Sequence, residues 1–97
     1  MAATTFTGSN QGPVTVDTYG PCGIVMFQGT ILGLNPRMVS CRVEDRRLVI
    51  SDGIGGVLRE YELVFDTVAH ARACGRAVLT ALAVAIRAGD PASGAIP

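Results

Sequence analysis

The most reactive side chains in this sequence are one histidine and three cysteines. His70 and Cys74 lie four residues apart in a segment predicted to be helical, so both would share one face of the helix, as metal ligands often do. Cys22 and Cys41 could complete a zinc site of three thiolates and one imidazole. The sequence lacks the closely spaced cysteine pair typical of structural zinc sites, and Cys41 takes an inward strand position, where cysteine acts as a small hydrophobic residue. We therefore predict neither a metal nor another cofactor, with zinc at these four residues as the alternative.

The same residues could form a base and a nucleophile, with His70 activating Cys22 or Cys74. A cysteine four residues along the same helix is poorly placed to attack a substrate, and no segment predicts an oxyanion hole. His70 also lies in the first turn of the predicted helix, where the helix dipole disfavours a protonated imidazole. We predict no catalytic residues and no enzymatic activity.

A glycine-rich turn at residues 51–56 (SDGIGG) could bind an anion through its backbone N–H groups. Arginines in and around the preceding hairpin could hold a phosphate or a carboxylate with two hydrogen bonds each. The candidate ligand-binding residues are Arg42, Arg46, Arg47, Gly53, Gly55, Gly56 and Arg59. The turn matches no phosphate-binding loop motif and leads into a strand. Plain turn chemistry explains the glycines, and cross-strand ion pairs with nearby acidic residues explain the arginines equally well.

The composition narrows the classes of partner. The chain has 97 residues, 48% of them hydrophobic and 16% charged, and its eight arginines balance eight acidic residues without any lysine. A neutral balance argues against a nucleic-acid partner, because nucleic-acid binders usually carry a basic excess. The widely spaced, odd cysteines predict a reducing, cytoplasmic setting. The longest uncharged apolar stretch, residues 77–86, is about half of a membrane span, so we expect no membrane association.

Alternating and glycine-interrupted apolar segments predict an α+β fold. Strands are expected at residues 13–19, 24–34 (one strand kinked at Gly29, or two strands turning there), 38–51 (a hairpin) and 57–65. Asp66 or Thr67 would cap a helix that ends near Gly89. We predict an antiparallel β-sheet of about four to six strands followed by one long C-terminal α-helix packed on it. The expected organisation is an extended N-terminal arm at 1–12, a single domain at 13–90 and a C-terminal tail at 91–97.

The predicted helix carries more apolar surface than one sheet can cover. One face holds larger apolar residues suited to the sheet, among them Leu79 and Ile86, and a narrow stripe that faces water holds Arg72, Arg76 and Arg87. The remaining face is made of small apolar residues: Ala73, Ala77, Ala81, Val84 and Ala88. Such a face would let a second helix approach closely, which predicts a homodimer or a higher homo-oligomer. The alternative is that alanine is simply the best helix former and faces solvent.

These observations favour a non-catalytic homo-oligomeric assembly or protein-interaction module. The N-terminal arm would reach a neighbour or a protein partner, and a phage or other assembly component is one setting that fits, in the cytoplasm or in a virion. The second hypothesis is a small-ligand-binding module that recognises an anionic, nucleotide-like ligand at a subunit interface. It would use the turn at residues 53–56 and the nearby arginines.

Overall fold

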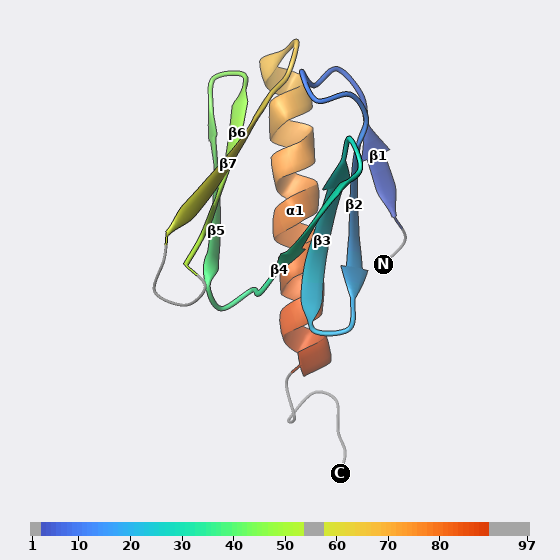
Figure 1. Ribbon diagram of the computed structural model, residues 1–97, viewed down its shortest axis with the longest axis vertical. Helices are drawn as coiled ribbons and strands as arrows, with labels where there is room; N and C mark the ends of the chain where they lie inside the picture. The colour runs from blue at the N-terminus through green and yellow to red at the C-terminus, as the bar shows by residue number, and fades with distance from the viewer. Residues whose placement is uncertain (1–2, 54–57, 90–97) are drawn as a thin grey trace.

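The computed structural model describes residues 3–53 and 58–89, which form seven strands and one helix (Figure 1). The elements are β1 (Thr4–Phe6), β2 (Val14–Tyr19), β3 (Cys22–Phe27), β4 (Thr30–Leu34), β5 (Val39–Glu44), β6 (Arg47–Asp52), β7 (Arg59–Val64) and α1 (Val68–Gly89). Strands β1 to β4 make one antiparallel sheet in chain order, and β5 to β7 make a second one. The α+β class and the C-terminal helix are confirmed. The strands form two sheets rather than the single sheet of four to six strands that we expected.

Helix α1 lies between the two sheets and packs on both. In Figure 1 it stands at the centre, with the β5–β7 sheet on the left and the β1–β4 sheet on the right. Its contacts reach β1, β2 and β3 of one sheet and β5 and β6 of the other. The core therefore forms around one shared helix, with inward residues from both sheets such as Val16, Val25 and Ile50.

The hairpins form because apolar and polar residues alternate along the strands and because residues at the turns adopt a positive φ. Gln28 and Gly29 both have positive φ, at 47° and 75°, and connect β3 to β4 as a two-residue turn. The apolar segment at 24–34 is thus two strands, the second of the two expected arrangements. Asp45, with φ at 58°, helps to turn the β5–β6 hairpin at the predicted place.

The segment expected to be an extended arm belongs to the fold. Strand β1 pairs with β2, and Ser9 forms an isolated β-bridge with Phe65. The Asn10 side-chain carbonyl accepts a hydrogen bond from the Val64 N–H at 3.1 Å, and the Asn10 N–H donates to the Val64 carbonyl at 2.7 Å. The small polar residues of this segment show no periodic pattern that would predict a strand, because its contacts are made mainly by the backbone. The tail predicted at 91–97 lies outside the described residues.

Helix α1 begins and ends where the capping residues predict. The Thr67 hydroxyl accepts a hydrogen bond from the His70 N–H at 3.1 Å, which makes Thr67 the N-cap, and Gly89 is the last helical residue. The buried positions cover a wide arc: Ala71, Cys74, Gly75, Val78, Ala81, Leu82 and Ala85. Leu79 and Ile86, which we expected to face the sheet, are 53% and 43% exposed. The buried face is rotated from the predicted one because two sheets, not one, cover the helix.

Candidate functional site

The four candidate zinc ligands do not form a metal site. No group of three or more potential ligands converges within residues 3–53 and 58–89. Burial raises the pKa of the Cys41 thiol from 9.0 to about 11. Burial raises that of Cys74 from 9.0 to about 12, with a further contribution from Cys41. Burial thus disfavours the thiolate form of both side chains, which is the form that binds zinc.

His70 pairs with an acidic residue just before its own helix rather than with a cysteine. Its Nδ1 lies 2.6 Å from Asp66 Oδ1, and both side chains are more than half exposed. The Asp66 N–H donates to the Gly8 carbonyl at 2.8 Å. The pair therefore lies at the start of the helix, beside the segment that carries Gly8, and no nucleophile is bonded to the imidazole in the described chain.

Most of the candidate anion-binding arginines are occupied by acidic residues of the same chain. Arg42 contacts Glu44 at 3.1 Å and Glu60 at 3.4 Å, and the hydrogen bond to Glu44 raises the pKa of its guanidinium. Arg47 contacts Glu62 at 3.2 Å and Glu44 at 3.5 Å. The two Arg47 pairs cross neighbouring strands, as the ion-pair interpretation predicted, whereas Arg42 contacts Glu44 within β5 and reaches over β6 to Glu60 of β7.

Arg59 has a structural partner. Its Nη2 lies 3.1 Å from Oδ2 of Asp52, a carboxylate whose side chain is only 2% exposed, across the β6–β7 register. Because a buried carboxylate requires compensation, this arginine is committed to the fold. Gly53 lies next to this pair, and its N–H donates to the Met38 carbonyl at 3.0 Å. Gly55 and Gly56 lie outside the described residues.

The structure also separates Arg46 and Arg47 from the glycine turn. Both arginines lie at the β5–β6 turn, whereas Gly53 follows the opposite end of β6. Six strand residues separate the two ends, or roughly 20 Å at about 3.3 Å per residue. One small ligand therefore does not contact Arg46 or Arg47 together with Gly53.

The small-residue face of the helix is used largely within the chain. Ala81 belongs to the buried core, and Ala77 packs against it. Ala73 and Val84 are half-buried, and only Ala88 is exposed. Packing within the core of the chain thus occupies much of the surface that we assigned to a second helix, and the prediction of a homo-oligomer loses this basis.

A groove between β5 and α1 brings together residues that the sequence analysis did not connect. It is about 260 Å³ in volume, and its lining residues are Cys41, Arg42, Val43, Arg72, Gly75, Arg76 and Leu79; we call it the β5 groove. Three consecutive residues of β5 line it although successive side chains point to opposite faces of a sheet, so the groove follows the edge of the strand. That edge has no neighbouring strand, because β5 pairs only with β6 in the described chain.

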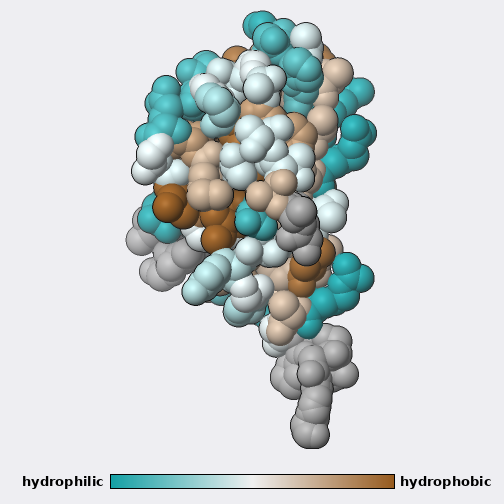
Figure 2. All heavy atoms as spheres, turned by 90° about the vertical axis from the view of Figure 1, so that its right-hand side faces the viewer, coloured by the Kyte–Doolittle hydropathy of each residue, from teal (hydrophilic) through white to brown (hydrophobic). Residues whose placement is uncertain are grey.

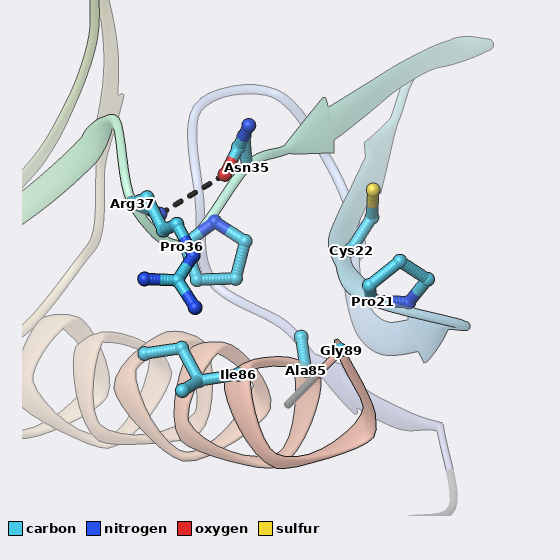
Figure 3. A pocket seen from close by; sticks show the side chains of 8 residues that line it. All are labelled: Pro21, Cys22, Asn35, Pro36, Arg37, Ala85, Ile86 and Gly89. Atoms are coloured by element: carbon cyan, nitrogen blue, oxygen red, sulfur yellow. Dashed lines mark hydrogen bonds between the residues drawn. The ribbon is translucent and has the colours of Figure 1, made fainter. Parts of the chain in front are cut away.

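A second hollow, the Cys22 pocket, lies near the C-terminal end of the same helix (Figure 3). It is about 240 Å³ in volume and is lined by Pro21, Cys22, Asn35, Pro36, Arg37, Ala85, Ile86 and Gly89. Figure 3 shows the Arg37 side chain above Ile86, with the turn at Pro21 and Cys22 on the other side. The Asn35 side-chain oxygen accepts a hydrogen bond from the Arg37 N–H at 3.0 Å, which holds this segment in a tight turn.

The groove and the pocket lie along one flank of α1. Near the middle of the helix Gly75 meets Val43, since a Cβ built on Gly75 would lie 2.9 Å from Val43 Cγ2. Near its end, Ala85 and Ile86 line the pocket with Pro36 and Arg37. The chain from residue 35 to residue 43 therefore runs antiparallel to the helix beside both hollows.

Positive charge along this flank is not neutralised within the described chain. Arg37, Arg72 and Arg76 make no side-chain ion pair or hydrogen bond to residues 3–53 and 58–89. Arg46, at the β5–β6 turn, is the fourth such arginine. From the sequence we grouped the arginines that are close along the hairpin and expected Arg72 and Arg76 on a stripe facing water. Their position beside β5 depends on the rotation of the helix, for which no sequence signal was available.

Some exposed apolar residues lie outside the β5 groove and the Cys22 pocket. On the side toward which the β1–β4 sheet lies, pale and teal residues cover most of the surface, with brown apolar residues gathered in limited areas (Figure 2). Ile31 of β4 is 68% exposed and lies outside both hollows. Helix α1 is long and apolar enough to satisfy a test for a membrane span, but core helices of soluble proteins satisfy the same test.

Comparison with known proteins adds no relative: no family model, no curated protein and no solved structure matches this chain.

Proposed function

We propose that this protein is a non-catalytic interaction module that binds an extended, acidic segment of a partner protein along the β5 groove. The observation that carries the proposal is the pair Arg72 and Arg76, unpaired within the described chain, beside the open edge of β5. An extended segment would add a strand to β5, so backbone hydrogen bonds would supply affinity and side chains facing α1 would supply specificity.

The shape of the groove supports an extended occupant. It follows a strand edge, and its apolar floor is formed by Val43, Gly75 and the exposed Leu79. An unpaired strand edge is a template for another strand, since each of its free N–H and C=O groups gains a partner when a segment docks. Gly75 allows this arrangement because a larger residue would push the helix away from Val43.

The charges support an acidic partner rather than a second copy of this chain. Glu44, Glu60 and Glu62 are paired with arginines, Asp52 with Arg59, and Asp66 with His70. Few carboxylates of a second copy are therefore left to neutralise Arg72 and Arg76. Carboxylates of another protein can form charge-assisted, bidentate hydrogen bonds with these guanidinium groups.

The test uses a fluorescein-labelled peptide of sequence TETETVTLT and its neutral counterpart TQTQTVTLT, measured by fluorescence anisotropy. We expect the acidic peptide to bind at least about tenfold more tightly, because each charge-assisted hydrogen bond contributes about 1.5–3 kcal/mol. Binding should weaken as salt rises from about 0.05 M to about 0.5 M, since salt screens the exposed charges. Equal affinity for both peptides, or no binding of either, would overturn the proposal.

Matched charge-reversal variants locate the site. Arg76→Glu should reduce the affinity about 10- to 100-fold. Arg46→Glu makes the same change at an arginine that is also unpaired in the described chain but lies at the β5–β6 turn, and it should retain wild-type affinity. Equal losses in the two variants would mean that the peptide responds to net charge and not to this groove.

Native mass spectrometry tests a second copy as the occupant. A monomeric mass in the absence of peptide, and a one-to-one complex in its presence, are the expected results. A dimer that Arg76→Glu dissociates would show that another copy of the chain fills the groove, and the acidic-partner proposal would then be wrong.

A further inference from the structure

We infer that the Cys22 pocket is a second anchor for the same partner segment and takes an apolar side chain four residues C-terminal to the acidic residue at Arg76. The inference rests on the proposed function of the β5 groove. It adds a sequence pattern for the partner: an acidic residue, three intervening residues, and a large apolar residue.

The spacing follows from the helix that the two hollows share. Arg76 and Ile86 are ten residues apart in α1, which corresponds to about 15 Å at 1.5 Å per residue. An extended segment covers that length in four or five residues at about 3.3 Å each. Side chains that point to the same side of a strand are an even number apart, and both anchors lie against α1, so the spacing is four.

The direction follows from β5. This strand runs from Val39, nearer the Cys22 pocket, toward Glu44 at the far end of the β5 groove. Antiparallel pairing is slightly more stable per residue than parallel pairing. An added strand that runs antiparallel to β5 passes the arginines first and reaches the pocket afterwards, so its acidic residue precedes its apolar residue.

The lining of the pocket suits an apolar side chain. Pro21, Pro36, Ala85 and the half-exposed Ile86 supply apolar walls (Figure 3). A volume of about 240 Å³ is equivalent to about eight water molecules at about 30 Å³ each, enough for one large side chain. Arg37 stands above Ile86 with its guanidinium unpaired in the described chain, so it favours further acidic character near the end of the segment.

Peptides of identical composition test spacing and direction. TETETVTLT places leucine four residues after its second glutamate, whereas its reversal, TLTVTETET, places leucine before the glutamates. We expect the first peptide to bind about tenfold more tightly, and replacing its leucine with serine should cost about tenfold as well, from the lost burial of one apolar side chain. Equal affinities of the two directions would overturn the inference.

Variants of the protein separate this inference from the proposed function. Ile86→Ser should weaken binding of TETETVTLT about tenfold and leave binding of its serine-substituted form unchanged. Ile31→Ser removes an equally large exposed side chain outside both hollows and should change neither. If binding of the acidic peptide depends on Arg76 but not on Ile86, the inference of a second anchor is wrong and the proposal for the β5 groove is retained. If no acidic peptide binds, both proposals are wrong.

Cys22 gives a readout that needs no substitution. Its half-buried side chain lines the pocket, while Cys74 is fully buried and Cys41 lines the β5 groove. Bound TETETVTLT should slow iodoacetamide labelling of Cys22 by the fraction of protein occupied, measured by peptide mapping. The serine-substituted peptide at the same occupancy should protect it less. Unchanged labelling at saturating peptide would show that the pocket stays empty.

Discussion

Five arginines of this chain fall into two groups according to what their guanidinium groups contact. Arg42, Arg47 and Arg59 contact acidic residues of their own β-sheet, so their charges are used within the fold. Arg72 and Arg76 have no such partner in the described chain and lie beside an open strand edge. An arginine that forms no ion pair within the fold therefore indicates a binding site better than an arginine that is merely close to a glycine turn in the sequence.

The Asp52–Arg59 pair should contribute to stability far more than the exposed pairs. Arg59→Ala leaves the carboxylate of Asp52, whose side chain is 2% exposed, with one fewer compensating charge, and we expect a loss of about 2 kcal/mol in the free energy of unfolding. Arg42→Ala removes contacts between exposed side chains and should leave the urea midpoint nearly unchanged. Equal losses from the two substitutions, measured by urea denaturation, would contradict this ranking.

Cys74 should make the protein less stable at alkaline pH. The unfolded chain releases the thiol proton near pH 9, whereas burial holds it in the folded chain until the pKa of about 12. Between these values the folded state binds more protons, so the free energy of unfolding falls as pH rises, by at most about 1.4 kcal/mol per pH unit for this group. Urea denaturation between pH 8 and pH 11 should show a smaller slope for Cys74→Ala. Parallel curves for the two proteins would mean that another group causes the fall.

At the scale of elements, regular alternation of apolar and polar residues made the strands predictable. The buried face of the helix was predicted wrongly, because we expected one sheet and the fold has two. Val39, Cys41 and Val43 alternate with polar residues, and they form β5 as expected. The helix pattern shows only that α1 is apolar over a wide arc, and it does not show how many sheets cover it. Ala81 was therefore assigned to an interface between copies, although it is buried in the core of its own chain.

The candidate site was less predictable than the fold because it joins distant parts of the chain. Arg42 and Arg76 line one groove, but they are 34 positions apart and only the packing of α1 against β5 brings them together. Strand β1 escaped prediction for a related reason, since its three residues are held mainly by backbone pairing with β2. Periodicity reports which side of an element is buried, and it carries no information about which element lies opposite.

The contact between α1 and β5 should be sensitive to a single methyl group. In Gly75→Ala the new Cβ would lie 2.9 Å from Val43 Cγ2 and 3.5 Å from Leu48 Cδ1, so the helix or the strand must shift. We expect a net loss of about 1–2 kcal/mol, because overpacking in the core outweighs the better helix propensity of alanine. Thermal unfolding monitored by circular dichroism measures this loss.

Two controls distinguish overpacking from a general effect of replacing glycine. A Cβ at Gly33 of β4 would meet nothing within 4 Å, so Gly33→Ala should be neutral or slightly stabilising. Adding Val43→Ala to Gly75→Ala should recover part of the lost stability, because it removes the methyl group in closest contact. If the double variant shows the sum of the two single losses, the contact between these residues is not the cause.

At the scale of the whole molecule, the proposed binding surface is assembled from every layer of the fold. The β5 groove uses the second sheet and the helix, while the Cys22 pocket uses the helix, the β2–β3 turn and the segment after β4. Helix α1 contacts both sheets, so the sheets and the binding surface should unfold together. A ligand on this surface therefore stabilises the entire chain.

This coupling predicts that the peptide TETETVTLT raises the unfolding temperature of the whole protein in a single transition. At a free concentration of about 100 times its Kd, a ligand that binds only the folded state adds about 2.7 kcal/mol, which should raise the Tm by roughly 10–20 °C in a chain of this size. Arg46→Glu should keep this increase and Arg76→Glu should lose about half of it or more at the same peptide concentration, since Arg76 lines the groove and Arg46 does not. Differential scanning calorimetry measures the Tm and the number of transitions together. Two transitions, of which the peptide moves one, would show that the sheets unfold independently and that α1 does not join them into one cooperative unit.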